Sequence, residues 1–130
     1  MANILVVDDA ILTQRLLEVM LRRIAHTTIS ALNGLEALEC LKETSVDLVI
    51  TDINMPEMDG LSFLDELRAA DSRHKNLPVI VMTASGLPYI PKIVSKKGAT
   101  IFLAQPFSSR ELTEAVTKCL TKEFINEKSI

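Results

Sequence analysis

The sequence predicts an α/β fold in which a parallel sheet carries helices on both faces. Short runs of branched apolar residues recur along the 130-residue chain without polar alternation, as expected for strands buried on both faces. Between these runs the apolar residues follow a helical period. Strand and helix therefore alternate five times, which is the pattern of a parallel sheet connected by crossover helices.

Five segments have the composition of strands. Residues 4–7 (Ile-Leu-Val-Val) form the first, and residues 47–51, 78–82 and 100–104 have the same apolar character. Residues 26–31 are more polar but rich in β-branched side chains, which favours a strand near an edge of the sheet.

The first expected helix begins near Ala10, where either Asp8 or Asp9 could serve as its N-cap. Its apolar residues repeat at intervals of four. The predicted buried face consists of Leu12, Leu16, Met20 and Ile24, broadened by Leu17 and Leu21.

Three further helices follow the same logic. Residues 34–43 place Leu35, Leu38 and Leu41 on one side, and residues 59–70 do the same with Phe63, Leu64 and Leu67. Ser108 and Glu111 form a capping box that starts the last helix. The stripe behind that capping box is Leu112, Ala115, Val116, Cys119 and Leu120. In the segment 86–91, two prolines allow a helix to begin near Pro91 but not much earlier.

Composition excludes several classes of protein. Hydrophobic residues make up 48% and charged residues 24%, as in ordinary globular domains. The net charge of −3 argues against a nucleic-acid or membrane footprint. We find no apolar run of membrane-spanning length and no signal peptide. The two cysteines lie in helix-like segments, so we expect reduced thiols and a cytoplasmic location.

Polar residues collect where the strands end. Asp8 and Asp9 follow the first strand, Asp52 the third and Thr83 the fourth. Ligands of such folds bind at the carboxyl ends of the strands, so the three carboxylates should converge there. Their repulsion favours a bound cation, and oxygen ligands favour Mg²⁺. A carboxylate beside Mg²⁺ is suited to act as a nucleophile in phosphoryl transfer. Thr83 could donate its hydroxyl to a phosphoryl oxygen or simply end a strand.

These residues, with their order and spacing, resemble the receiver domain of two-component response regulators. The similarity rests on Val-Val-Asp8-Asp9, the segment 52–60 (Asp-Ile-Asn-Met-Pro-Glu-Met-Asp-Gly), Thr83-Ala84, Gly98-Ala99 and Gln105-Pro106-Phe107, and it spans residues 3–120. The resemblance implies a flavodoxin-like doubly wound (βα)5 fold with strand order 2-1-3-4-5. It assigns residues 1–121 to the receiver and 122–130 to a short tail.

By resemblance, Asp52 accepts a phosphoryl group from a histidine kinase or phosphotransfer protein. Mg²⁺, or another divalent cation such as Mn²⁺, would be held by Asp9 directly, Asp8 through water, Asn54 through its backbone carbonyl, and Asp52. Thr83 would contact the phosphoryl group and move with it, and Phe102 occupies the position of the family's aromatic switch. From the residues alone, Phe102 is equally a buried or alternating strand residue.

One residue departs from the family pattern. A lysine usually precedes the Pro-Phe pair after the fifth strand, and this chain has Gln105 there. A neutral amide forms weaker hydrogen bonds to phosphate than an ammonium group does. We therefore expect weaker phosphate contact and weaker switching, while phosphorylation remains possible.

The resemblance also implies partners. A downstream protein would dock on the face of the fourth helix, fifth strand and fifth helix, which in the family also forms dimers. Lys92, Lys96 and Lys97 give the fourth helix a basic surface that could bind an acidic partner or be only a solvated face. We expect a signalling domain, not an enzyme with a separate substrate, and no direct contact with nucleic acid or membrane.

Three alternatives remain open at this point. Gln105 is compatible with a docking module that no longer responds to phosphate. An aspartyl phosphatase of the same architecture usually has an acid two residues after its nucleophile, where this chain has Asn54. A flavin-binding role is disfavoured because Asp8 and Asp9 would repel the flavin phosphate.

Overall fold

A computed structural model describes residues 2–53, 55, 58–69, 72–83 and 90–121, apart from three side chains in the helix that begins at residue 90. The strands are β1 (Asn3–Val7), β2 (Thr27–Ala31), β3 (Leu48–Asp52), β4 (Val79–Thr83) and β5 (Ile101–Ala104). All four pairings are parallel, in the order β2-β1-β3-β4-β5. The predicted fold class and strand order are confirmed, and β2 lies at an edge as expected.

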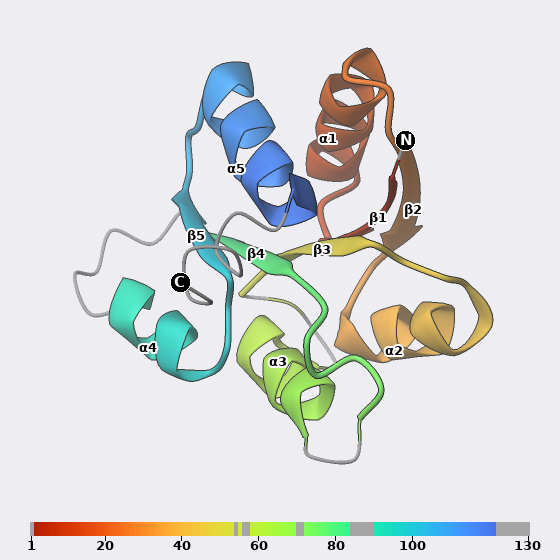
Figure 1. Cartoon of the computed structure of the whole chain (residues 1–130), viewed down its shortest axis with the longest axis vertical. Coiled ribbons are helices and arrows are strands. Elements are labelled where there is room, and N and C mark those ends of the chain that lie inside the picture. Colours follow the sequence, from red (N-terminus) through yellow and green to blue (C-terminus); the bar gives the residue numbers. More distant parts are fainter. Residues whose placement is uncertain (1, 54, 56–57, 70–71, 84–89, 122–130) are drawn as a thin grey trace.

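The helices are α1 (Ile11–Arg23), α2 (Gly34–Glu43), α3 (Gly60–Arg68), α4 (Ile90–Lys96) and α5 (Ser109–Thr121). In Figure 1, α1 and α5 cover one face of the sheet, and α2, α3 and α4 cover the other. Among the described residues, no helix is both long enough and apolar enough to cross a membrane.

Successive strand residues enter two separate cores. On β1, Ile4 and Val6 pack toward α1 and α5, whereas Leu5 and Val7 pack toward α2 and α3. All four side chains are fully buried. This double burial explains why the strands show continuous apolar runs instead of alternation.

The predicted faces of α3 and α5 are confirmed. Phe63, Leu64 and Leu67 are buried on α3. On α5, Leu112, Ala115, Val116 and Cys119 are buried, and Leu120 is partly buried against the same core. The capping box is present in both directions: Ser108 N–H donates to Glu111 Oε1 (2.9 Å), and Glu111 N–H donates to Ser108 Oγ (3.0 Å). On α2, Leu41 is buried and Leu38 partly so, but Leu35 is 47% exposed and Ala37 takes its place in the core.

The predicted face of α1 is wrong in its first half. Leu12 is 83% exposed and Leu16 is 60% exposed, whereas Leu17 and Leu21 are buried together with Gln14. The helix is rotated so that the Gln14 amide reaches two backbone carbonyls, those of Asp8 (2.8 Å) and Ala31 (2.7 Å). A buried carbonyl without a donor is costly, so these bonds favour the observed rotation.

Candidate functional site

Three carboxylates meet at the carboxyl ends of β1 and β3. One oxygen from each of Asp8, Asp9 and Asp52 lies within 4.8 Å of the other two. We call these residues the acid cluster. β1 has β2 on one side and β3 on the other, so the cluster lies where the strand order reverses, the usual ligand position in such sheets. The predicted convergence is confirmed.

Asp8 is the most buried member of the acid cluster, with 2% of its surface exposed. Its N–H donates to the Ala31 carbonyl (3.0 Å), and its Oδ1 accepts from the Ala10 N–H (2.8 Å) just before α1. Burial raises the pKa of Asp8 to about 6, and the neighbouring Asp52 and Asp9 carboxylates add to the rise, although the Ala10 N–H opposes it. A bound cation would offset the cost of burying a charged carboxylate and would reduce the repulsion among the three carboxylates.

Asp52 ends β3 and is fixed by its own chain. Its Oδ1 accepts a hydrogen bond from the Ile53 N–H (2.7 Å). The Ile53 carbonyl in turn accepts from the Gly60 N–H (2.7 Å), which closes the segment between β3 and α3. A Cβ at Gly60 would lie 2.3 Å from the Asp52 carbonyl oxygen, so only glycine permits this closure.

The donor set fits a hard divalent cation. Asp9 is exposed and Asp52 half-buried, so an ion could reach the acid cluster and keep part of its water shell. Asn54, the remaining predicted metal ligand, lies outside the described residues.

Thr83 and Gln105 lie side by side at the same edge of the sheet. Thr83 ends β4 with only 1% of its surface exposed, one position beyond the partner of Asp52 in the β3–β4 ladder. The Gln105 N–H, just after β5, donates to the Thr83 carbonyl (2.8 Å). Phe102 is half-buried and packs against the core on the α2 and α3 face, which fits its reading as a core residue; its role as a switch stays a prediction.

Gln14 is the site residue that the sequence analysis missed. Its amide supports the Asp8 backbone and the end of β2 at once. A signal was present: Gln14, Leu17 and Leu21 are spaced by three and four residues, so Gln14 falls on the true buried face.

A groove of about 870 Å³ lies between α1 and the start of α5. Leu16, Met20, Pro106 and Phe107 supply much of its apolar lining, and Gln105 lies among them. Val19 also lines the groove, and Ile11 and Leu12, which begin α1 shortly after Asp9 in the sequence, are exposed as well.

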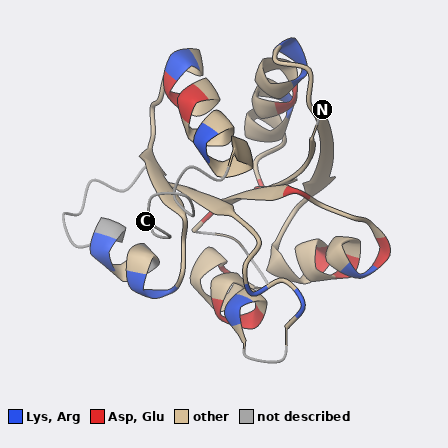
Figure 2. Ribbon diagram, viewed as in Figure 1, with Lys and Arg blue, Asp and Glu red and all other residues tan. Residues whose placement is uncertain are grey.

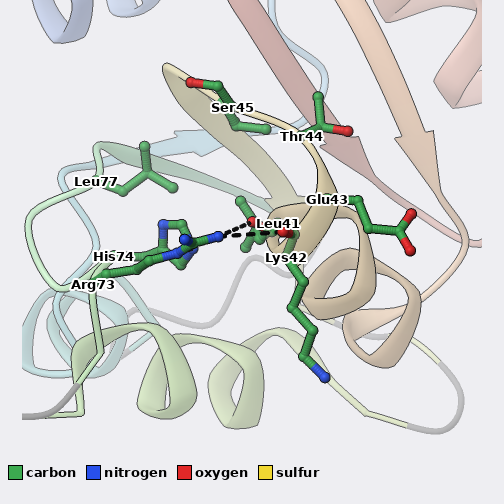
Figure 3. Close-up of a pocket in the computed structure, with 9 residues that line it drawn as sticks. Leu41, Lys42, Glu43, Thr44, Ser45, Arg73, His74 and Leu77 are labelled. Atoms are coloured by element: carbon green, nitrogen blue, oxygen red, sulfur yellow. Dashed lines mark hydrogen bonds between the residues drawn. The ribbon is translucent and has the colours of Figure 1, made fainter.

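A second cavity, of about 500 Å³, lies at the end of α2 away from its first turn. Figure 3 shows Arg73 and His74 within it, with the Arg73 guanidinium donating to the carbonyls of Leu41 (3.1 Å) and Lys42 (3.4 Å). These bonds satisfy carbonyls at the end of α2, so the polar lining of this cavity serves as a helix cap.

The basic surface of α4 is only partly solvated. Figure 2 shows Lys and Arg, without acidic residues, along α4. Lys92 and Lys96 are exposed, whereas Lys97, which was expected on this helix, lies just after its last residue and pairs with Asp65 on α3 (2.9 Å). Tyr89, Ile90 and Pro91, which the sequence analysis also considered, have no described side chains.

Comparisons with known proteins agree with this geometry. Residues 4–117 match the model of the response regulator receiver domain. The chain is 34% identical over 119 residues to the chemotaxis protein CheY of Bacillus subtilis, covering 91% of this chain and 97% of that protein. It is 35% identical over 118 residues to sporulation initiation phosphotransferase F of the same organism, covering 91% and 93%.

Solved structures give the same result. The chemotaxis response regulator CheY4 of Vibrio cholerae superposes with a TM-score of 0.84 at 30% identity, covering 92% of this chain and 99% of that one. The chain therefore belongs to the response regulator receiver domain family.

Proposed function

We propose that this receiver accepts a phosphoryl group on Asp52 from a sensor histidine kinase or a phosphotransfer protein, with Mg²⁺ at the acid cluster. The observation that carries the proposal is the convergence of Asp8, Asp9 and Asp52 within 4.8 Å at the reversal of strand order. One of the relatives carries phosphotransferase in its name.

The transfer is a nucleophilic substitution at phosphorus. An Asp52 oxygen forms a bond to phosphorus while the bond from phosphorus to the donor's histidine nitrogen breaks, its electron pair staying on nitrogen. When bound, Mg²⁺ would offset the charge on the transferring group. The Ile53 N–H orients the attacking carboxylate, and Asp8 and Asp9 would hold the ion with the Asn54 carbonyl. The Thr83 hydroxyl would donate to a phosphoryl oxygen.

Partners and surroundings belong to the same proposal. The exposed apolar side chains of α1, beside Asp9, suit the approach of the phosphodonor. A downstream protein, or a second copy of this chain, would dock on α4, β5 and α5, where Lys92 and Lys96 favour acidic groups. We place the domain in the cytoplasm of a bacterium, which fits its two free cysteines. It is a signalling domain that promotes its own phosphorylation and dephosphorylation, not an enzyme with a separate substrate.

The alternative of a docking module insensitive to phosphate is not supported by the comparisons. Its motivation was Gln105, but the acid cluster contains every carboxylate that transfer and metal binding require. A module freed from metal binding has little reason to keep three acids whose repulsion contributes to the raised pKa of Asp8.

The direct test is incubation with acetyl phosphate and Mg²⁺, followed by mass spectrometry of the modified residue. We expect the wild type to be labelled on Asp52 alone, and Asp52→Asn to remain unlabelled. Glu66→Gln, an exposed substitution on α3, is the matched control and should label like the wild type. Labelling of another residue, or equal labelling of Asp52→Asn, would contradict the assignment. In a Mg²⁺ titration, Asp9→Asn should lose binding, and an unchanged affinity would remove the metal site.

A further inference from the structure

The first turn of α2 touches the segment that follows Asp52. The Gly34 N–H, at the start of α2, donates to the Met58 carbonyl (3.2 Å). A Cβ at Gly34 would lie 2.8 Å from Met58 Cγ, 3.0 Å from Met58 Sδ and 3.0 Å from the Met58 carbonyl oxygen. The absence of a side chain at Gly34 therefore allows α2 and this segment to approach each other this closely.

The α2 side of this contact is held firmly. Asn33 caps the helix by accepting from the Glu36 N–H (2.9 Å), and Glu36 Oε1 accepts from the Leu32 N–H (2.9 Å). Ala37 and Leu41 of the same helix are buried against the sheet. With its cap satisfied and its apolar face packed, the first turn is a fixed support and not a fraying end.

The other side of the contact leads directly to Asp52. Met58 packs against the core on the α2 and α3 face, and Gly60 closes back onto the Ile53 carbonyl (2.7 Å). The Ile53 N–H holds the Asp52 carboxylate. Met58 is thus held by α2 two residues before Gly60, and Gly60 is joined through Ile53 to the Asp52 carboxylate.

We infer that Gly34 is a positioning residue of the phosphoacceptor site: by holding Met58, the first turn of α2 fixes the chain where Gly60 closes onto Ile53, and so sets the position of the Asp52 carboxylate toward Mg²⁺. This inference rests on the proposed function, because it concerns the same metal site. It adds to the site Gly34, a residue of α2 that would contact neither the metal nor the phosphoryl group. Residues that orient metal ligands commonly contribute about tenfold to about a hundredfold in metal affinity.

Gly34→Ala tests the inference with a sign that helix propensity does not predict. Alanine favours a helix over glycine by about 1 kcal/mol, so an effect confined to α2 would leave the site unchanged and stabilise the fold. We expect instead that Mg²⁺ affinity falls about tenfold. In Gly34→Ala/Met58→Ala, two of the three close contacts are gone, so much of the affinity should return. Leu35→Ala, an exposed change in the same turn, is the matched control and should bind Mg²⁺ like the wild type.

A measurement on the unaltered protein keeps the test independent of how well the variants fold. Coupling is reciprocal, so if the Gly34–Met58 contact strengthens Mg²⁺ binding about tenfold, Mg²⁺ must stabilise the contact by the same factor. Hydrogen exchange of the Gly34 amide should therefore slow about tenfold at saturating Mg²⁺, in an experiment without phosphodonor.

The outcomes distinguish failure of the proposed function from failure of the inference about Gly34. Wild-type protein that does not bind Mg²⁺ would overturn the proposed function together with this inference. Wild-type protein that binds Mg²⁺, with Gly34→Ala binding equally well or with Gly34 exchange unaffected by the ion, would overturn the inference alone. Loss of affinity in Gly34→Ala with recovery in the double variant would support both.

Discussion

Helices α1 and α5 invite comparison because each has 13 residues and both cover the same face of the sheet. α5 buries the stripe that its sequence predicts, whereas α1 leaves Leu12 and Leu16 in solvent and buries Gln14. The difference shows that an apolar stripe identifies a helix but does not say which of its faces meets the core. On α1 a polar side chain matters as well: the rotation that is observed lets the buried Gln14 amide donate to the Asp8 and Ala31 carbonyls.

The comparison predicts that truncating a leucine on α5 and a leucine on α1 changes the free energy of unfolding by very different amounts. Leu112→Ala on α5 removes a buried side chain and should lower the free energy of unfolding by about 2–5 kcal/mol. Leu12→Ala on α1 changes an 83% exposed side chain and should change it by no more than about 0.5 kcal/mol. Urea unfolding of both variants measures the difference. Equal costs would mean that α1 packs through Leu12 after all.

Gln14 offers the next largest effect. Gln14→Met keeps the length of the side chain but removes the donor to the Asp8 and Ala31 carbonyls. The Ala31 carbonyl keeps the Asp8 N–H as a donor, but the Asp8 carbonyl loses the Gln14 donor, which should cost about 1–3 kcal/mol of unfolding free energy. The neighbouring Arg15→Met, on an exposed position, provides the baseline in the same denaturation series. A stabilising Gln14→Met would show that the apolar pattern, and not the amide, determines how α1 packs.

Much of the fold could be predicted from the pattern of apolar residues in the sequence. Residues such as Leu5 and Val81 lie in continuous apolar runs because both faces of the sheet are covered, and that property is local to each strand. The acid cluster was equally predictable, since Asp8 and Asp52 end neighbouring parallel strands. The stripe of α5 was correct because its helix has a single apolar face.

The rest depends on contacts between distant segments. The rotation of α1 brings the Gln14 amide to the Ala31 carbonyl, 17 residues away in the sequence. The contact between Gly34 and Met58 joins α2 to the segment after β3, and no periodicity within either segment encodes it. Such polar and backbone contacts are specified only when the tertiary structure brings their two partners together.

The acid cluster should make Mg²⁺ binding depend on pH. The pKa of Asp8 rises from 3.8 to about 6 on folding, mainly through burial. Because folding raises the pKa of Asp8, the folded protein binds this proton more tightly than the unfolded chain does. Protonated Asp8 therefore contributes to the stability of the metal-free protein below about pH 4, and the contribution is lost as the pH rises through about 6. Mg²⁺ needs the ionised form, and its affinity should fall about tenfold per pH unit below 6.

Isothermal titrations with Mg²⁺ between pH 5 and pH 8 would measure this dependence. Asp8→Asn removes the titrating group, so its weaker Mg²⁺ affinity should lose most of the slope. The same slope in wild type and Asp8→Asn would assign the proton to another carboxylate of the cluster. Gln14→Met tests whether α1 influences this titration. Loss of the Gln14 amide should displace the Asp8 backbone and so shift the midpoint of the pH dependence of Mg²⁺ affinity.

Gln105 lies in the groove between α1 and α5, and its replacement gives the smallest expected effect. Its backbone is already joined to Thr83 (2.8 Å), so a lysine at this position starts from the same place in the fold. An ammonium group forms stronger bonds to a phosphoryl group than an amide does, by about 1 kcal/mol. A two-state domain responds only as far as its ligand distinguishes the states, so Gln105→Lys should increase the population shift about fivefold. Backbone NMR shifts of Thr83 and Phe102, with and without beryllofluoride, measure that population in both proteins. If the wild type already converts fully and the lysine variant gains nothing, the missing charge does not limit the response.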